Sequence, residues 1–247
     1  MAKLTIGDYK DQVKEIKKEQ PEELKNELAR AKEYNVGIAK EGIPESFAIR
    51  EGTSDPEYES LLNVTGDGCM GICEIPCIHV KLPVYHYTKK SVLEKGVGHL
   101  FGSSLPVGGK NTHAILSAHS GLPSAKLFTD LDKLEKGDKF FITVLDTTYA
   151  YQVYKIDVVE PDDTSTLKID PDKDLCTLVT CTPYAVNTHR LLVHGKRVPY
   201  NPAEKNAVGG HRMNLGNILL RSLCAAGGIA LAYILLKFKD RIFNKKR

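Results

Sequence analysis

The sequence predicts a mainly β protein: a closed or nearly closed β-barrel, preceded by a helical segment and followed by a transmembrane helix. Seven short runs of strand-forming residues lie between residues 72 and 196, residues 7–40 carry apolar residues at helical spacing, and residues 218–236 form a long apolar run. Of the 247 residues 42% are hydrophobic, enough for one well-buried core. The 34 basic and 31 acidic residues nearly balance, so the charge gives no reason to expect a nucleic-acid partner.

Residues 1–41 are expected to form an N-terminal helical segment. Lys, Glu, Gln and Ala are abundant there, and Leu24, Leu28 and Ala31 recur at helical spacing. Pro21 suits the first position of a helix. The apolar stripe is narrow, so we expect one or two exposed helices that pack loosely against the main domain or the membrane surface.

Residues 42–64 are expected to form a surface loop, because glycine and proline interrupt every apolar run there. A barrel domain is expected over residues 65–202. The predicted strands cover residues 72–75, 80–85, 114–118, 139–145, 149–159, 175–181 and 190–196. Short helices are expected at residues 91–95 and 124–134. Many short strands separated by turn residues are typical of a barrel.

Residues 203–217 are predicted to be a tether, and residues 218–236 a transmembrane helix. This 19-residue run carries one charge, Arg221, near an end where a long side chain can reach the membrane interface; a buried core helix is the alternative. The tail at 237–247 holds six basic residues against Asp240, which predicts a cytoplasmic C-terminus and a barrel outside the cell. Since no signal peptide or apolar anchor precedes the barrel, we expect a further segment upstream of the given sequence.

Six cysteines do not form the pattern of a disulfide framework. Cys69, Cys73 and Cys77 are four residues apart, and we interpret them as small buried apolar side chains. A metal site that uses them with His79 is the alternative.

Cys176 and Cys181 are five residues apart in one predicted strand, so their side chains should point to opposite faces. Cys181 ends the strand and is followed by Thr182 and Pro183, which places it at a rim of the barrel. A lone cysteine is more often buried and inert than catalytic, so Cys181 needs partners to be a nucleophile.

Two partners stand at comparable strand ends, His119 and Arg190. A base or a cation increases the thiolate population of a cysteine, and histidine can protonate a leaving amine. A guanidinium can hold a carbonyl or an oxyanion without losing its charge. The spacing alone does not show that the three side chains meet.

Residues 177–181 read Thr-Leu-Val-Thr-Cys, which matches the sortase signature T-L-x-T-C, and Arg190 follows nine residues later. The match extends from Tyr58 to Tyr200 and includes residues 82–86, 96–100 and 112–119. The sequence resembles the class C, pilin-polymerising sortases of Gram-positive bacteria. This resemblance implies an eight-stranded sortase β-barrel, a catalytic set of Cys181, His119 and Arg190, no cofactor, and membrane anchoring with the barrel outside the cell.

The resemblance also implies a lid whose Asp-Pro-aromatic tripeptide covers the cysteine. No such tripeptide occurs in this sequence. Residues 55–58 (Asp-Pro-Glu-Tyr) and 43–47 (Ile-Pro-Glu-Ser-Phe) are the two imperfect candidates, so any lid is degenerate.

The implied reaction is transpeptidation. Cys181 attacks the Thr-Gly carbonyl of an LPxTG-like sorting signal, and the amine of a pilin lysine then resolves the thioester. The alternatives are a cell-wall anchoring sortase that uses a peptidoglycan precursor amine, a cysteine hydrolase, and a barrel that binds sorting signals or a metal without turnover.

Overall fold

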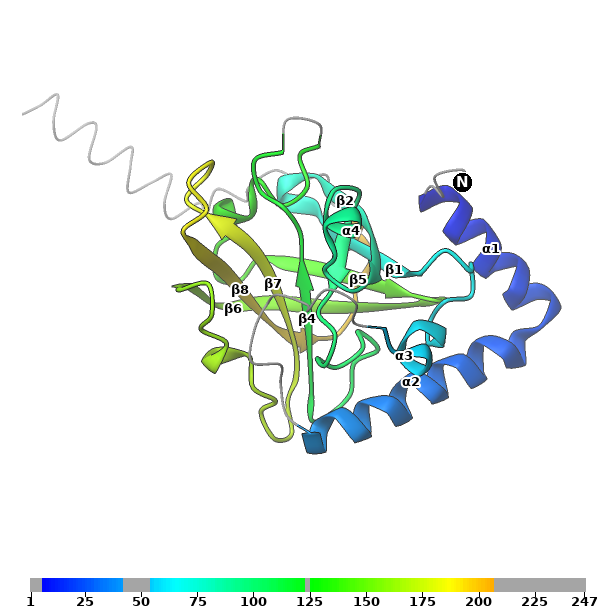
Figure 1. Ribbon diagram of the computed structural model, residues 1–247. Coiled ribbons are helices and arrows are strands. Elements are labelled where there is room, and N and C mark those ends of the chain that lie inside the picture. The colour runs from blue at the N-terminus through cyan, green and yellow to red at the C-terminus, as the bar shows by residue number, and fades with distance from the viewer. Residues whose placement is uncertain (1–5, 42–53, 123–124, 207–247) are drawn as a thin grey trace, which may run out of the picture. The chain divides into compact units, whose positions relative to one another are not determined.

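The computed structural model describes residues 6–41, 54–122 and 125–206, and eight of its strands close into a barrel (Figure 1). Around the barrel the order is β1-β2-β3-β4-β7-β8-β6-β5. The pairs β2–β3 and β4–β7 are parallel and the other six are antiparallel. The strands are β1 (Cys69–Ile75), β2 (Val80–His86), β3 (Val97–His99), β4 (Thr112–Ser117), β5 (Lys139–Val144), β6 (Thr147–Val159), β7 (Asp174–Thr182) and β8 (His189–Val198).

All seven predicted strands are present, and the sequence pattern missed one, β3. This strand has only three residues, with Gly98 at its centre, so it carries almost no strand signal of its own. A Cβ atom at Gly98 would lie 2.4 Å from the carbonyl oxygen of Tyr87. The strand is therefore defined by the close approach of its backbone to the chain that follows β2, which no local pattern reveals.

The N-terminal segment contains two helices, α1 (Ile6–Glu19) and α2 (Pro21–Glu41), beside the barrel (Figure 1). They are held more firmly than the expected loose packing. The Tyr9 hydroxyl donates to the carbonyl of Met70 and accepts from the N–H of Leu145. The Asn35 amide bonds both the N–H and the carbonyl of Leu105. These buried hydrogen bonds to distant backbone have no signature in the helical spacing.

Two of the predicted short elements differ from the structure. The helix expected at 124–134 is reduced, within the described residues, to turns and the 3₁₀ helix η2 (Leu131–Lys133). Leu127 has a φ of 38°, which is incompatible with a continuous helix, although Leu127, Leu131 and Leu134 are all buried. The helix predicted at 91–95 is present as α4 (Lys90–Leu93).

The predicted loop at 42–64 contains a short helix, α3 (Pro56–Ser60), whose N-cap is the Asp55 carboxylate. This helix includes one of the two lid candidates. Its aromatic residue, Tyr58, is fully buried and bonds Nδ1 of His99 at 2.7 Å. The ring of Tyr58 contacts Tyr34, His86, Tyr87, His99 and Phe101. Residues 55–58 therefore anchor the chain to the barrel core and do not cover Cys181.

The other lid candidate at 43–47, the transmembrane helix at 218–236 and the basic tail at 237–247 lie outside the described residues. In the described part of the chain, none of the helices has both the length and the apolar character needed to cross a bilayer. The predicted tether begins as a short helix, α5 (Pro202–Asn206), where Lys205 pairs with the carboxylate of Glu74 at 3.0 Å. The remaining 3₁₀ helices are η1 (Pro76–Ile78) and η3 (Ser165–Leu167).

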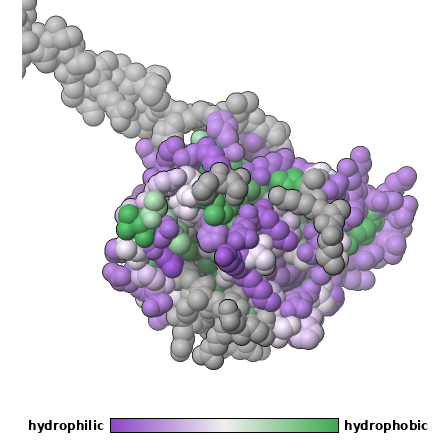
Figure 2. Space-filling view, turned by 45° about the horizontal axis from the view of Figure 1, so that its top comes forward, coloured by the Kyte–Doolittle hydropathy of each residue, from purple (hydrophilic) through white to green (hydrophobic). Residues whose placement is uncertain are grey.

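Two apolar clusters lie on opposite faces of the sheet at β4, β7 and β8. Leu178, Leu191 and Val193 belong to the large cluster inside the barrel. Val179 and Leu192, which alternate with them, belong to a smaller cluster with Leu167 from the β6–β7 loop, residues 160–173. The loop therefore covers part of the outer face of the barrel. Elsewhere the surface is largely hydrophilic on the face shown in Figure 2.

Candidate active site

Cys181 lies near the end of β7, and the register of the sheet sets Arg190 directly opposite it on β8. Cα atoms of antiparallel partners are about 4.5–5.5 Å apart, so the two side chains stand next to each other on one face. Cys181 is half-buried, whereas Cys176 is fully buried and belongs to the barrel interior. The prediction that these two cysteines point to opposite faces is confirmed, and only Cys181 is open to a substrate.

His119 follows β4, which runs parallel to β7 on the side away from β8. Ser117 is paired with Val179, and the N–H of Ala118 donates to the Val179 carbonyl at 3.1 Å. Continuing this register by two residues places His119 beside Cys181. The structure thus brings His119, Cys181 and Arg190 onto three adjacent strand ends, which the sequence spacing could not establish.

Thr180 holds this arrangement together and was not singled out from the sequence. Its hydroxyl donates to the carbonyl of Ala118 at 2.8 Å, so β7 grips the residue before His119 through both its backbone and a side chain. Thr180 and Ala118 are both buried. The signature threonine next to the cysteine was the available signal, because a buried hydroxyl needs a partner.

We predict that Thr180→Val lowers both activity and stability. Valine keeps the shape but leaves the buried Ala118 carbonyl without its donor, which costs about 1–3 kcal/mol. A shift of His119 relative to Cys181 should reduce kcat about tenfold or more. Peptide-cleavage kinetics and thermal melts measure the two effects. Thr148→Val is the matched control, because it removes a threonine–threonine hydrogen bond of 3.0 Å on β5 and β6; equal kinetic losses in both variants would contradict the positioning role.

Arg190 is oriented by the β7–β8 turn. Its Nη1 donates to the carbonyl of His189 at 3.1 Å and, at 3.4 Å, to that of Asn187. His189 in turn lies 3.3 Å from the carboxylate of Glu160, at the start of the β6–β7 loop. The guanidinium is therefore held by backbone carbonyls of the turn, from the residue whose Cα is paired with that of Cys181. A group that stabilises a developing negative charge needs such a defined position.

Burial lowers the pKa of His119 below its ordinary value, while the Glu94 carboxylate raises it and the Lys90 ammonium lowers it. Both charged residues belong to α4 or follow it directly. We predict that Glu94→Gln shifts the pKa of His119 further down and that Lys90→Met shifts it up. NMR titration of ¹⁵N-labelled histidine measures both shifts, and movement of the two variants in the same direction would contradict the electrostatic cause.

Two large apolar side chains stand exposed on the β7–β8 turn, between Cys181 and Arg190 in the chain. Tyr184 and Val186 are each 64% exposed. The ring of Tyr184 lies over Gly121, two residues after His119, since a Cβ atom there would be 3.2 Å from it. These side chains therefore provide an apolar surface next to the three polar residues, suited to an extended peptide.

The other cysteines among the described residues take no part in this arrangement. Cys69 and Cys73 are buried in β1, and burial raises the pKa of Cys69 to about 12. Burial likewise raises the pKa of the half-buried Cys77 to about 11. Among the described residues, no group of three or more His, Cys, Asp or Glu side chains is placed to hold a metal ion. The alternative metal site at Cys69, Cys73, Cys77 and His79 is thus not formed.

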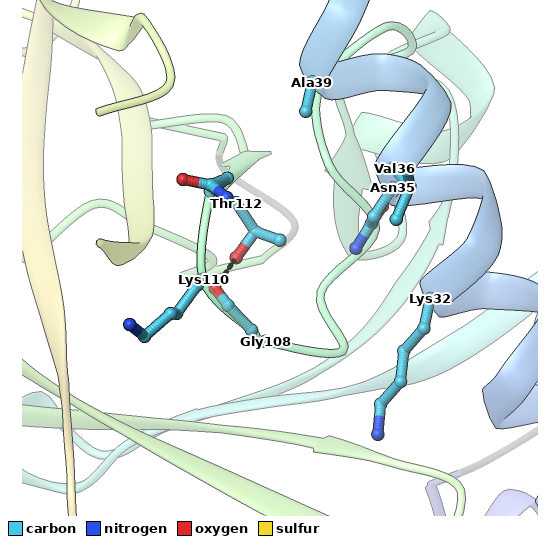
Figure 3. Close-up of a pocket in the computed structure, with 9 residues that line it drawn as sticks. Lys32, Asn35, Val36, Ala39, Gly108, Lys110 and Thr112 are labelled. Carbon is cyan, nitrogen blue, oxygen red and sulfur yellow. Dashed lines mark hydrogen bonds between the residues drawn. The ribbon is translucent and has the colours of Figure 1, made fainter. Parts of the chain in front are cut away.

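A cavity of about 500 Å³ lies elsewhere, between α2 and the chain that leads into β4 (Figure 3). Its lining includes Lys32, Val36, Gly108 and Lys110, and none of the three predicted site residues.

A thiol, an imidazole and a guanidinium on adjacent strand ends can carry out acyl transfer: nucleophilic attack, protonation of the leaving amine and stabilisation of the oxyanion. The site is therefore assigned to the strand ends of β4, β7 and β8.

Comparison with known proteins agrees with this chemistry. The Sortase domain model matches residues 73–198, about half of the chain. Sortase D of Bacillus subtilis is 34% identical over 164 residues, which cover 65% of this chain and 80% of that protein.

The structure is also similar to solved structures of sortases. Sortase C1 of Streptococcus agalactiae shares 47% identity at a TM-score of 0.71, with 79% of this chain and 98% of that chain covered. Sortase C of Streptococcus pneumoniae shares 40% identity at a TM-score of 0.67, with 79% and 96% covered. The catalytic roles of Cys181, His119 and Arg190 remain a prediction from their chemistry and placement. From its domain match and its barrel, the chain belongs to the sortase family of cysteine transpeptidases.

Proposed function

We propose that this sortase joins pilin subunits to one another through a thioester on Cys181. The observation that carries the proposal is the likeness, at 40–47% identity, to sortases C1 and C. The solved structure of the Streptococcus pneumoniae enzyme concerns its pilin substrate specificity. The side-by-side placement of Cys181 and Arg190 supports the chemistry.

In the first half-reaction the Cys181 thiolate attacks the threonine carbonyl carbon of an LPxTG-like sorting signal. The oxyanion that forms is stabilised by the Arg190 guanidinium, which keeps its charge throughout. The Thr-Gly C–N bond then breaks, and the glycine nitrogen takes a proton from His119. The products are a threonyl thioester on Cys181 and a free downstream peptide.

In the second half-reaction the neutral ε-amine of a pilin lysine attacks the thioester carbonyl. His119 accepts the proton that the amine loses, and the Cys181 thiolate leaves. An isopeptide bond between two pilins results, with the enzyme returned to its starting state. The apolar side chains of Tyr184 and Val186 support the proposal because they offer a surface for the apolar part of the signal.

The test is a ligation assay with a pilin that carries both a sorting signal and its acceptor lysine. We expect a covalent ladder on a denaturing gel, and we expect the same pilin with Lys→Arg at the acceptor position to give no ladder. If only monomer forms while a peptidoglycan-precursor amine is ligated efficiently, the cell-wall anchoring reaction replaces the proposed one. Monomer cleaved by water alone would indicate a hydrolase, and binding without cleavage a non-catalytic barrel.

We also propose that the chain is membrane-anchored through residues 218–236, with the barrel outside the cell and the C-terminus in the cytoplasm. The supporting features are the 19-residue apolar run and the six basic residues that follow it. Protease added to intact protoplasts should digest the barrel and spare a C-terminal tag. A protected barrel would contradict this topology.

A further inference from the structure

The start of β3 lies next to His119, on the side of β4 that faces away from Cys181. Gly98 on β3 is paired with Ser117 on β4 in antiparallel register. Continuing this pairing by two residues places Gly96 opposite His119. With the order β3-β4-β7-β8, this end of the sheet presents four residues in a row: Gly96, His119, Cys181 and Arg190. The chain that leads into β3 is therefore the neighbour of His119 on the flank away from the thiol.

The backbone of this neighbouring segment has a fixed position. A Cβ atom at Gly96 would lie 2.7 Å from the carbonyl oxygen of Pro83 on β2, so the chain is pressed against that strand. The N–H of Gly96 donates to the carbonyl of Val92 in α4 at 3.0 Å. Glu94, at the C-terminal end of α4, is thus held two residues before the point opposite His119.

Glu94 presents an exposed carboxylate on this flank of His119. Within the part of the chain that the structure describes, its side chain forms no ion pair and no hydrogen bond. Burial lowers the pKa of His119, and the Glu94 carboxylate opposes that shift. The electrostatic effect agrees with the register: the carboxylate is close enough to the imidazole to act on its charge.

Three lysines flank Glu94 in the sequence, and two of them are directed at aromatic rings. Nζ of Lys95 lies 3.9 Å from the centroid of the Tyr85 ring, and Nζ of Lys89 lies 4.3 Å from that of Tyr87. The third, Lys90, has no ring contact or ion pair among the described residues, and its ammonium lowers the pKa of His119. Glu94 and Lys90 are therefore two opposite charges that act on His119 from this flank.

The second half-reaction of the proposed function sets the side from which the acceptor amine approaches. The amine attacks the thioester carbon at Cys181 and gives a proton to His119, so it has to lie within reach of both. Arg190 stands on the other flank of Cys181, where its guanidinium serves the carbonyl oxygen of the signal. The amine then arrives on the flank of His119, where Glu94 is an exposed anion.

We propose, as an inference that rests on the proposed function, that Glu94 is an acceptor-binding residue whose carboxylate pairs with the ε-ammonium of the incoming pilin lysine beside His119. Lys90 weakens this pairing. The bound ammonium releases one proton to solvent, and the neutral amine that remains attacks the thioester. Exposed carboxylate–ammonium pairs are modest in strength and are screened by salt, so Glu94 sets the preference for a lysine acceptor and leaves the chemistry of transfer to Cys181 and His119.

The test compares a charged acceptor with an uncharged one, using the full chain purified in detergent. The acyl-enzyme is formed with sorting-signal peptide and resolved either by a lysine-bearing pilin or by hydroxylamine, an amine that is uncharged at neutral pH. Glu94→Gln should raise the KM for the pilin about two- to fivefold at low salt and leave the KM for hydroxylamine unchanged. The difference should shrink at high salt, and Glu94→Asp should restore most of the parent's KM for the pilin.

Two further variants complete the test. Lys90→Met should lower the KM for the pilin, because it removes a charge that repels the ammonium. Asp132→Asn is the matched control, since it removes an exposed carboxylate of η2, in the loop that follows His119, and should leave both KM values unchanged.

Equal changes in the KM for pilin and for hydroxylamine would show that Glu94 acts only through His119, and would overturn the inference while the proposed function stands. A shift of Glu94→Gln and Lys90→Met in the same direction would overturn it as well. If the parent passes its acyl group to hydroxylamine but never to the pilin lysine, the proposed function fails and the inference fails with it.

Discussion

Cys181→Ala is expected to abolish the covalent adduct between this sortase and a sorting-signal peptide. The thioester forms on this sulfur, and alanine offers no nucleophile, so the loss should be complete within detection. Intact-protein mass spectrometry after incubation with an LPxTG peptide measures the adduct. Cleavage should fall by several orders of magnitude at the same time, as expected when a nucleophile is removed.

Cys176→Ala is the matched control, because it changes a cysteine of the same strand that faces the barrel interior. The adduct should persist in this variant, with some loss of stability from the small cavity left in the core. An adduct that survives loss of Cys181, or disappears with loss of Cys176, would contradict the assignment of the nucleophile.

Arg190→Lys should lose most of its activity although it keeps the charge. A planar guanidinium can direct two parallel N–H groups at a carbonyl or oxyanion, and lysine offers a single flexible ammonium instead. Removing one such donor from an acyl-transfer site reduces kcat about 100-fold or more. Steady-state kinetics with the peptide measure the loss, and near-normal turnover would reduce Arg190 to a structural residue.

Arg197→Lys is the control for this substitution, because Arg197 stands on the same strand away from the thiol. Its guanidinium lies over the Tyr149 ring, 4.5 Å from the centroid. We expect kcat to remain within about twofold of the parent. If Arg197→Lys lost as much kcat as Arg190→Lys, activity would be sensitive to any such substitution on β8, and not specifically to the residue opposite Cys181.

The sequence predicts the strands well where each one is long enough to carry its own alternating pattern, as β6 and β7 do. It fails at β3, whose three residues are fixed by the backbone around Gly98. It also fails after His119, where Leu127, Leu131 and Leu134 share a helical spacing but are buried through turns. The spacing of apolar residues predicts which residues are buried more reliably than it predicts the secondary structure that those residues adopt.

The three predicted site residues could be selected from the sequence because each ends a strand and one stands in a known signature. Their proximity could not be predicted, since it depends on the parallel pairing of β4 with β7, two strands separated by more than 50 residues. The same limit hid the role of Thr180, whose hydroxyl bonds the Ala118 carbonyl just beyond the end of β4. The lid candidate at residues 55–58 fails for a similar reason, because the sequence does not show that the ring of Tyr58 is buried against His99.

The central claim, a thioester on Cys181 that a pilin lysine resolves, is tested most directly in a single turnover. The acyl-enzyme is formed with sorting-signal peptide, excess peptide is removed, and a lysine-bearing pilin is added while intact mass spectrometry follows both proteins. We expect the peptide's acyl mass to leave Cys181 and to appear on the pilin lysine, located by fragmentation. An acyl group mapped to another residue, or one released to water while the pilin stays unmodified, would contradict the account.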